Sequence, residues 1–204
     1  MQREMRGDPM PRTIAIVCVA LMLVGGAADA FGQAPAGKAA PGTPDPWFVR
    51  TTRVQFQPQR AYDAPVQVDL PRKDWAVLPS SGSGLLTLVT RKLDAMFSAD
   101  QTVLRQELTP ADITDLFGQI ETEAIKERSP KASQFESRVI DTGGRRLVVV
   151  QYVRPGALGT EKVRQYSIPA GKALYRLTCV APAAQFAAFD ATCAHMAASF
   201  SVGP

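Results

Sequence analysis

Histidine is nearly absent from this sequence, and its scarcity removes many of the usual enzyme sites. His195 is the only histidine among 204 residues. One imidazole cannot build a histidine-rich metal centre, and no serine or cysteine forms a recognisable triad with it. His195 also lies off the apolar seam of its segment, so we expect it to point to solvent. A catalytic site that uses carboxylates alone stays open as an alternative.

Long apolar runs are equally scarce. The run IAIVCVALMLV at residues 14–24 is shorter than the roughly 20 residues that a membrane-spanning helix needs. Arg12 precedes it, and small residues including Ala28-Asp29-Ala30 follow it. This order is typical of a secretory signal peptide, which we assign to residues 1–30, with an uncleaved membrane anchor as the alternative. We therefore expect a periplasmic or secreted protein.

Runs of basic residues are missing as well. The net charge is +4, and removing residues 1–30 takes away three basic and three acidic residues, which leaves that value unchanged. A small positive charge without a basic run makes nucleic acid a poor candidate partner.

Two cysteines, Cys179 and Cys193, follow the signal segment, and an oxidising compartment would permit a disulfide between them. Geometry argues against it. A helix that begins near Ala184, level with Cys179, carries Cys193 about 13 Å along its axis. A bridge needs Cα atoms within roughly 7 Å of each other. We therefore favour two buried free thiols over a bridge.

The region before the compact domain has two parts. Residues 31–46, FGQAPAGKAAPGTPDP, have almost no bulky apolar side chains and are typical of a flexible tether. Trp47 and Phe48 then begin an aromatic lead-in that reaches residue 63. We favour a lead-in that packs on the domain, and the alternative is a peptide that docks on a partner. A single compact domain is expected over residues 64–204.

Apolar periodicity within residues 64–204 predicts both strands and helices. Residues 66–70 alternate as a half-buried strand does, whereas Leu147 to Val150 are all apolar, which is typical of a strand covered on both faces. Gly143-Gly144 permits a tight hairpin before this strand. Thr109 and Pro110 are typical of a helix start, and we expect that helix to reach Pro130. Its predicted buried face consists of Ile113, Leu116, Phe117, Ile120 and Ala124.

A strand over residues 174–179 and a helix over residues 184–200 close the chain. The apolar seam of this last helix consists of Phe186, Phe189, Cys193, Met196 and Phe200. Together the elements predict an α+β fold with a mostly antiparallel sheet of about five to seven strands. One helix on each face of a single sheet would satisfy the strands that are apolar on both sides, which makes an α/β/α sandwich.

The order of these elements resembles a known family. The shared features are the entry Leu70-Pro71-x-x-Asp74-Trp75, the helix led by Thr109-Pro110, the central LVVVQYV strand and the final helix that ends in Ala198-Ser199-Phe200. They are similar to the PsbP-like superfamily, named for the extrinsic P protein of photosystem II and shared with a nuclear import factor that binds the GTPase Ran. The resemblance covers about residues 64–202. It implies a non-enzymatic binding or accessory role, often in exported bacterial proteins, and it assigns no site residue.

Few side chains qualify as site candidates. Arg145, Arg146, Arg154 and Arg164 follow one another through the predicted meander and are candidates for contact with an anion or a partner. Trp75 is interpreted as a plug that seals the core rather than as a ligand platform. The glutamates of the first helix are interpreted as a solvated face; they are Glu121, Glu123 and Glu127.

We therefore predict a non-catalytic exported domain that binds a protein or envelope component. The expected partner is an envelope protein or an anionic polymer. No catalytic, cofactor-binding or metal-binding residue is assigned. The alternative is a small secreted enzyme, hydrolase-like, with an unrecognised site based on carboxylates. A deep pocket with converging carboxylates would favour the enzyme, and a shallow surface with apolar or basic side chains would favour binding.

Overall fold

The computed structural model describes residues 44–51, 54–61, 64–79, 84–90, 92–142, 144–157 and 159–203. The predicted signal peptide and most of the predicted tether lie outside the described residues. No helix among the described residues is both long enough and apolar enough to cross a membrane.

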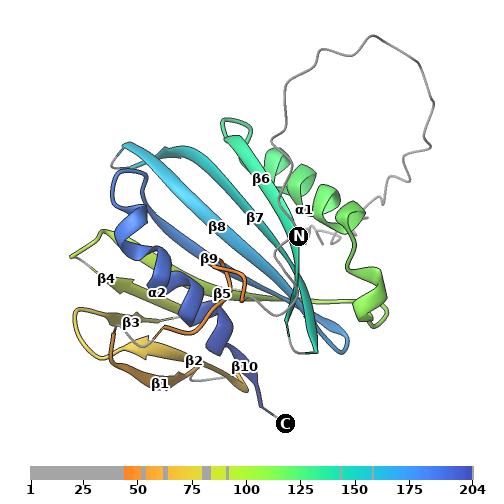
Figure 1. Cartoon of the computed structure of the whole chain (residues 1–204), viewed down its shortest axis with the longest axis horizontal. Coiled ribbons are helices and arrows are strands. Elements are labelled where there is room, and N and C mark those ends of the chain that lie inside the picture. Colours follow the sequence, from red (N-terminus) through yellow and green to blue (C-terminus); the bar gives the residue numbers. More distant parts are fainter. Residues whose placement is uncertain are drawn as a thin grey trace, which may run out of the picture. The chain divides into compact units, whose positions relative to one another are not determined.

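The largest element of the fold is a seven-stranded antiparallel sheet with the strand order β3-β4-β5-β9-β8-β7-β6 (Figure 1). The strands are β3 (Ala76–Leu78), β4 (Gly84–Thr90), β5 (Ala95–Val103), β6 (Ser133–Thr142), β7 (Arg145–Gly156), β8 (Gly159–Ala170) and β9 (Ala173–Pro182). Strands β6 to β9 form the predicted meander, and Gly144 adopts a φ of 100° in the turn between β6 and β7. Glycine suits that turn because L side chains rarely adopt a positive φ.

Two helices cover opposite faces of this sheet. Helix α1 (Asp115–Arg128) contacts β6 and β7, and helix α2 (Phe186–Ser199) contacts β9. Strand β7 shows the two-sided burial directly. Val148 packs with Ile125 of α1, whereas Val149 packs in the cluster that contains Met196 of α2. The predicted α+β sandwich with a doubly covered central strand is confirmed.

A second, smaller sheet was not expected. It consists of β1 (Phe56–Arg60), β2 (Val66–Pro71) and β10 (Ser201–Val202), in the order β1-β2-β10. Strand β2 packs on α2, so this helix lies between the two sheets (Figure 1). The strand predicted at residues 66–70 is therefore real, but its placement in one single sheet was wrong. Alternation specifies which side of a strand is buried and does not specify its neighbours.

The folded unit begins before Ala64. Trp47 and Phe48 are each only 7% exposed and belong to the main apolar cluster, which also contains Ala61. Strand β1 pairs with β2 along its whole length. The packing interpretation of the aromatic lead-in is confirmed, and the predicted boundary at residue 64 was too late. The predicted tether, residues 31–46, ends where these bulky side chains begin, but the aromatic lead-in that follows it belongs to the folded unit.

The first helix differs from the prediction in its start and its orientation. Thr109 caps a short 3₁₀ helix (Pro110–Asp112), and the chain then turns before Thr114 caps α1. Leu116 and Ile120, predicted to be buried, are 64% and 56% exposed. The buried residues of α1 are Gly118, Glu121 and Ile125. Ile113 and Phe117 pack in the apolar cluster beneath α1, but Glu121 and Ile125 rather than Leu116 and Ile120 continue its buried face.

Candidate functional site

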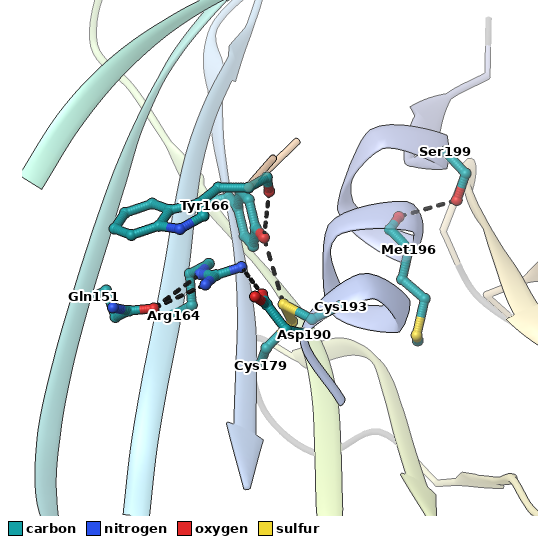
Figure 2. Close-up of a disulfide and its surroundings, with 9 residues drawn as sticks. Gln151, Arg164, Tyr166, Cys179, Asp190, Cys193, Met196 and Ser199 are labelled. Atoms are coloured by element: carbon teal, nitrogen blue, oxygen red, sulfur yellow. Dashed lines mark hydrogen bonds and ion pairs between the residues drawn. A yellow bond between two sulfur atoms is a disulfide. The ribbon is translucent and has the colours of Figure 1, made fainter. Parts of the chain in front are cut away.

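Cys179 and Cys193 form a disulfide, contrary to the expectation of free thiols (Figure 2). Strand β9 continues three residues past Cys179 before the chain turns, which is roughly 10 Å at the rise of a strand. Helix α2 then runs back and reaches Cys193 seven residues after its start, again roughly 10 Å. The two distances cancel and leave the Cα atoms 6.0 Å apart. The prediction failed because it placed the start of the helix level with Cys179.

Arg164, a candidate for surface contact, is instead buried beside the disulfide. It is 1% exposed, and its Nε and Nη2 atoms donate to Gln151 Oε1 at 3.2 and 2.8 Å. Its Nη1 atom is paired with Asp190 of α2 (Figure 2). The guanidinium group also lies 4.5 Å from the centre of the Trp47 ring. Because its donors and its face are used within the fold, Arg164 is not available to a ligand at the surface.

Tyr166 connects this network to the lead-in and to the disulfide. Its hydroxyl donates to the carbonyl oxygen of Trp47 at 2.7 Å and lies 3.4 Å from Cys193 Sγ (Figure 2). Burial raises the pKa of Tyr166 well above its ordinary value, so the phenol stays protonated and remains a donor. The ring of Trp47 also lies against a second guanidinium, that of Arg138, at 3.5 Å. Residues 45–48 are thereby fixed to the sheet.

The remaining candidate arginines do not form one patch. Arg145 and Arg154 stand at opposite ends of β7, nine residues apart, which is roughly 30 Å in a strand. Arg145 Nη1 donates to the carbonyl oxygen of Phe200 at 2.7 Å and so caps the end of α2. Arg154 Nε is paired with Glu161 at 3.0 Å. Arg146 follows Arg145 directly, so its side chain projects from the other face of the strand.

Glu121, predicted to be solvated, is a buried carboxylate that is 3% exposed. Arg176 donates to both of its oxygens, at 2.8 and 3.0 Å. Ser167 Oγ and Gln165 Nε2 also donate to Oε2, at 2.7 and 3.3 Å. Burial alone would raise the pKa of Glu121, but the hydrogen bonds from Arg176 and Ser167 outweigh it and hold the pKa below its ordinary value. A carboxylate that is ionised and saturated with donors serves as a structural anion rather than as a general base.

His195 is buried as well, contrary to the expectation that it faces solvent. It is 6% exposed, and its ring stacks on Phe56 of β1 with the ring centres 3.6 Å apart. Its Nδ1 atom accepts a hydrogen bond from the backbone amide of Thr51 at 2.9 Å. The proton therefore resides on Nε2, which lies 3.3 Å from Asp69 Oδ2. Burial lowers the pKa of His195, and the contact with Asp69 opposes this shift.

Ser199 lies one helical turn after His195, so a serine, a histidine and an aspartate meet in this region. Their hydrogen bonds are not those of a nucleophilic triad. Ser199 Oγ donates to the carbonyl of Met196 at 3.0 Å and accepts from the amide of Asp69 at 2.9 Å. The imidazole nitrogen that would have to face the serine accepts the amide of Thr51 instead. Within the described part of the chain, no group of three or more histidine, cysteine, aspartate or glutamate side chains could hold a metal ion.

A polar cleft of about 420 Å³ opens beside this cluster, at the end of α2. It is lined by Phe48, Arg50, Gln67, Asp69, Thr142, Arg145, Ala198, Ser199, Phe200 and Ser201. Arg145 is the one predicted contact residue in this lining, and it already caps α2. The exposed Arg50 is the other cation of the lining, whereas the carboxylate of Asp69 and the carbonyl end of the helix both disfavour an anionic ligand here. The cleft is therefore a weak candidate for an anion site.

A second depression, of about 550 Å³, is lined by a different type of residue. We call it the Trp75 groove. It lies among the β2–β3 turn, the β4–β5 turn and the first half of α2, and its lining consists of Val54, Gln55, Pro71, Arg72, Lys73, Asp74, Trp75, Thr90, Lys92, Leu93, Ala188 and Thr192. Trp75 packs on Phe189 with the ring centres 5.8 Å apart. The predicted packing role of Trp75 is confirmed, and the half-buried indole also lines the groove.

The rim of the Trp75 groove is basic. Arg72, Lys73 and Lys92 are all exposed, and Asp74 is the only acidic residue of the lining. Lys92 Nζ lies 3.9 Å from Asp74, and both side chains are more than half exposed, so this pair is weak and leaves the lysine accessible. Asp74 and Asp94 adopt positive φ values of 67° and 44° in the two turns that border the groove. Aspartate is one of the residues that adopt this left-handed conformation in tight turns, so both turns that border the groove are tight.

The chain has the PsbP-like fold, as the resemblance in the sequence implied. Comparison of the sequence with protein-family profiles and with curated proteins finds no match.

The cyanobacterial PsbP protein CyanoP of Synechocystis is similar over 83% of this chain and 99% of its own, with a TM-score of 0.57 and 12% identity. LpqN of Mycobacterium tuberculosis, involved in cell envelope biogenesis, is similar over 74% of this chain and 92% of its own, with a TM-score of 0.50 and 17% identity. The Ran-binding protein Mog1p of Saccharomyces cerevisiae covers 73% of this chain at a TM-score of 0.49 and 13% identity. At such identities the similarity shows the fold alone.

Proposed function

We propose that this protein is a non-catalytic exported domain that binds an anionic component of the cell envelope, and that the Trp75 groove is its binding surface. Two observations support the proposal: buried polar side chains of the domain are bonded to one another, and the Trp75 groove presents exposed cations to solvent.

Three buried side chains of types common in catalysis, His195, Ser199 and Glu121, are engaged in the fold. Both nitrogens of His195 have partners, and the hydroxyl of Ser199 has two. Both oxygens of Glu121 accept from Arg176. A catalytic base or nucleophile must present a free atom to its substrate. This disfavours the alternative of a hydrolase based on carboxylates.

The observation that carries the proposal is the composition of the Trp75 groove. A half-buried indole lines the groove together with three exposed cations, Arg72, Lys73 and Lys92, and one acidic residue. Apolar depressions with a few convergent polar groups are the usual form of a ligand site. The excess of two positive charges at the rim favours an anionic partner and speeds its association.

The disulfide supports export. Structural disulfides form and persist in oxidising compartments and are rare in a reducing cytosol. Cys179 and Cys193 are both fully buried, so their bond is a stable cross-link between β9 and α2 rather than an exposed redox site. A periplasmic or secreted location agrees with this bond.

Cosedimentation with an envelope fraction of the source cells tests the proposal. The protein without residues 1–30 should bind that fraction, and binding should weaken with rising salt. The variant R72E/K73E/K92E should bind at least tenfold more weakly. A matched control, R105E/K131E/K172E, reverses three exposed charges outside the groove lining and should bind like the wild type. Equal binding by the groove variant and the wild type would show that the groove is not the binding surface.

A further inference from the structure

The Trp75 groove combines three kinds of surface that one class of ligand can use together. Its apolar part consists of Trp75 and Leu93 with Val54 and Pro71. Its neutral polar groups are the amide of Gln55 and the hydroxyls of Thr90 and Thr192. The cations of the rim form the third surface.

A sugar ring matches the first two surfaces. One side of a pyranose presents C–H groups, which pack on an aromatic face, and its edge presents hydroxyls, which pair with amides and hydroxyls. An acidic group on the ring then matches the third surface, because guanidinium and ammonium groups form their strongest hydrogen bonds with carboxylate or phosphate. A neutral sugar would form no ion pair with the cations, and a simple anion would not pack on the indole.

The size and borders of the groove agree with this ligand. About 550 Å³ lies within the roughly 300–1,000 Å³ typical of small-molecule sites. Turns and a helix border the groove, rather than the strand edge on which a peptide binds by strand addition. Arg72, Lys73 and Lys92 come from two turns, β2–β3 and β4–β5, so cations reach the groove from more than one segment.

We propose that the Trp75 groove binds an acidic glycan, with one sugar ring stacked on Trp75 and its carboxylate or phosphate held by Arg72, Lys73 and Lys92. This inference rests on the proposed function, because it names the chemistry of the anionic component at the same surface.

Titration calorimetry with defined probes tests the inference. A trimer of galacturonic acid is the acidic probe, a trimer of galactose is its neutral counterpart, and a trimer of glutamic acid supplies similar charge without a ring. We expect the acidic trisaccharide to bind at least tenfold more tightly than either of the others. W75A should lose at least tenfold of that affinity, and W75F should recover part of it. The same acidic trisaccharide carrying phosphate in place of carboxylate distinguishes the two acidic groups.

Other results overturn the inference in distinct ways. Equal binding of the glutamate trimer would mean that the groove recognises acidic peptide, and equal binding of the neutral trimer would mean that charge is not recognised. If no acidic sugar binds, but R72E/K73E/K92E binds the envelope fraction more weakly than the wild type, the ligand class is wrong and the proposed function stands. If that variant binds the envelope fraction as tightly as the wild type does, the proposed function itself is wrong. Circular dichroism of each variant confirms that it is folded.

Discussion

Glu121 and Arg176 form an ion pair on the side of the large sheet that α1 covers. The glutamate side chain is 5% exposed and that of the arginine 21%, so both charges have lost much of their hydration. Removing one partner of such a pair leaves the other charge without compensation. The pair therefore holds α1 to β9 through opposite charges as well as through apolar contact.

Replacing Glu121 with Gln should lower the free energy of unfolding by about 3 kcal/mol at pH 7. The pKa of Glu121 is lowered in the folded state, so its contribution is fully present above its ordinary pKa of about 4.3. That contribution is lost as the pH falls below this value and through the folded pKa. The difference between wild type and E121Q, measured by urea unfolding, should be constant from pH 6 to 8 and shrink below about pH 4.5.

Glu123 of the same helix supplies the control. Its partner Lys126 lies 2.7 Å away, but the two side chains are 67% and 47% exposed. Exposed pairs contribute little, so E123Q should change the free energy of unfolding by less than about 0.5 kcal/mol. A similar loss for E123Q and E121Q would contradict the buried pair.

His195 can be followed directly because it is the only imidazole of the chain. Burial lowers its pKa, and Asp69 opposes the shift. We expect NMR of the ring protons to give a pKa below the ordinary value of about 6.5. D69N should lower the pKa further, because it removes the opposing charge. A pKa above 6.5, or one that D69N leaves unchanged, would contradict the geometry at Asp69.

The same shift has a consequence for stability. As the pH falls below about 6.5, the unfolded chain takes up a proton at His195 before the folded chain does. Stability should therefore decline on acidification until the folded imidazole is also protonated. The variant H195Q should lack this part of the decline between pH 7 and 5, measured by urea unfolding.

At the scale of elements, the disulfide is the covalent link between strand β9 and helix α2. The closed loop spans 14 residues in sequence, and a loop of this size contributes about 3 kcal/mol. Addition of a thiol reductant under partly denaturing conditions should lower the free energy of unfolding by about that amount. The variant C179A/C193A should not respond to the reductant. An intact mass that shows two free thiols before reduction would contradict the bond.

Local patterns predicted the central strands well and the first helix poorly. Leu147 to Val150 are apolar at consecutive positions, and a strand covered on both faces buries such a run. The exposure of Leu116 and Ile120 was not predictable from periodicity, because Glu121 bonds to Ser167 and Arg176 of the sheet and turns its own face of α1 inward. An apolar periodicity argument fails where a buried charged residue sets the orientation of a helix.

The site was less predictable because its partners are remote in sequence. His195 is covered by Phe56 and bonded to Thr51, which precedes it by 144 residues. The Trp75 groove is lined by residues of two turns and of α2. From the sequence, Trp75 was predicted only to pack against the core. The burial of a polar residue and the convergence of separate turns produce no local sequence pattern. Strands and helix ends do, as alternating apolar residues and as capping residues.

At the scale of the molecule, residues 44–51 complete the core rather than connect to it. Trp47 and Phe48 fill the main apolar cluster, and Trp47 also lies against Arg138 and Arg164. Asp45 is paired with Arg138 at 3.7 Å. Strand β1 then covers β2 and His195. A domain cut at residue 64 would expose the surfaces that all of these groups cover.

Two truncations test where the domain begins. A chain that starts at Pro44 keeps every described contact, so it should unfold at the same urea concentration as the chain that starts at residue 31. A chain that starts at Ala64 loses Trp47, Phe48 and β1, and removal of one large aromatic side chain alone costs about 3–5 kcal/mol. We expect the shorter chain to be unfolded or to lack cooperative unfolding.

W47A in the longer chain separates the contribution of Trp47 from that of β1. A decrease of about 3–5 kcal/mol in the free energy of unfolding would show that Trp47 accounts for much of the stability that the truncation removes. Cooperative unfolding of the chain from Ala64 at the stability of the longer one would show that the lead-in is dispensable and that the boundary predicted from composition was correct.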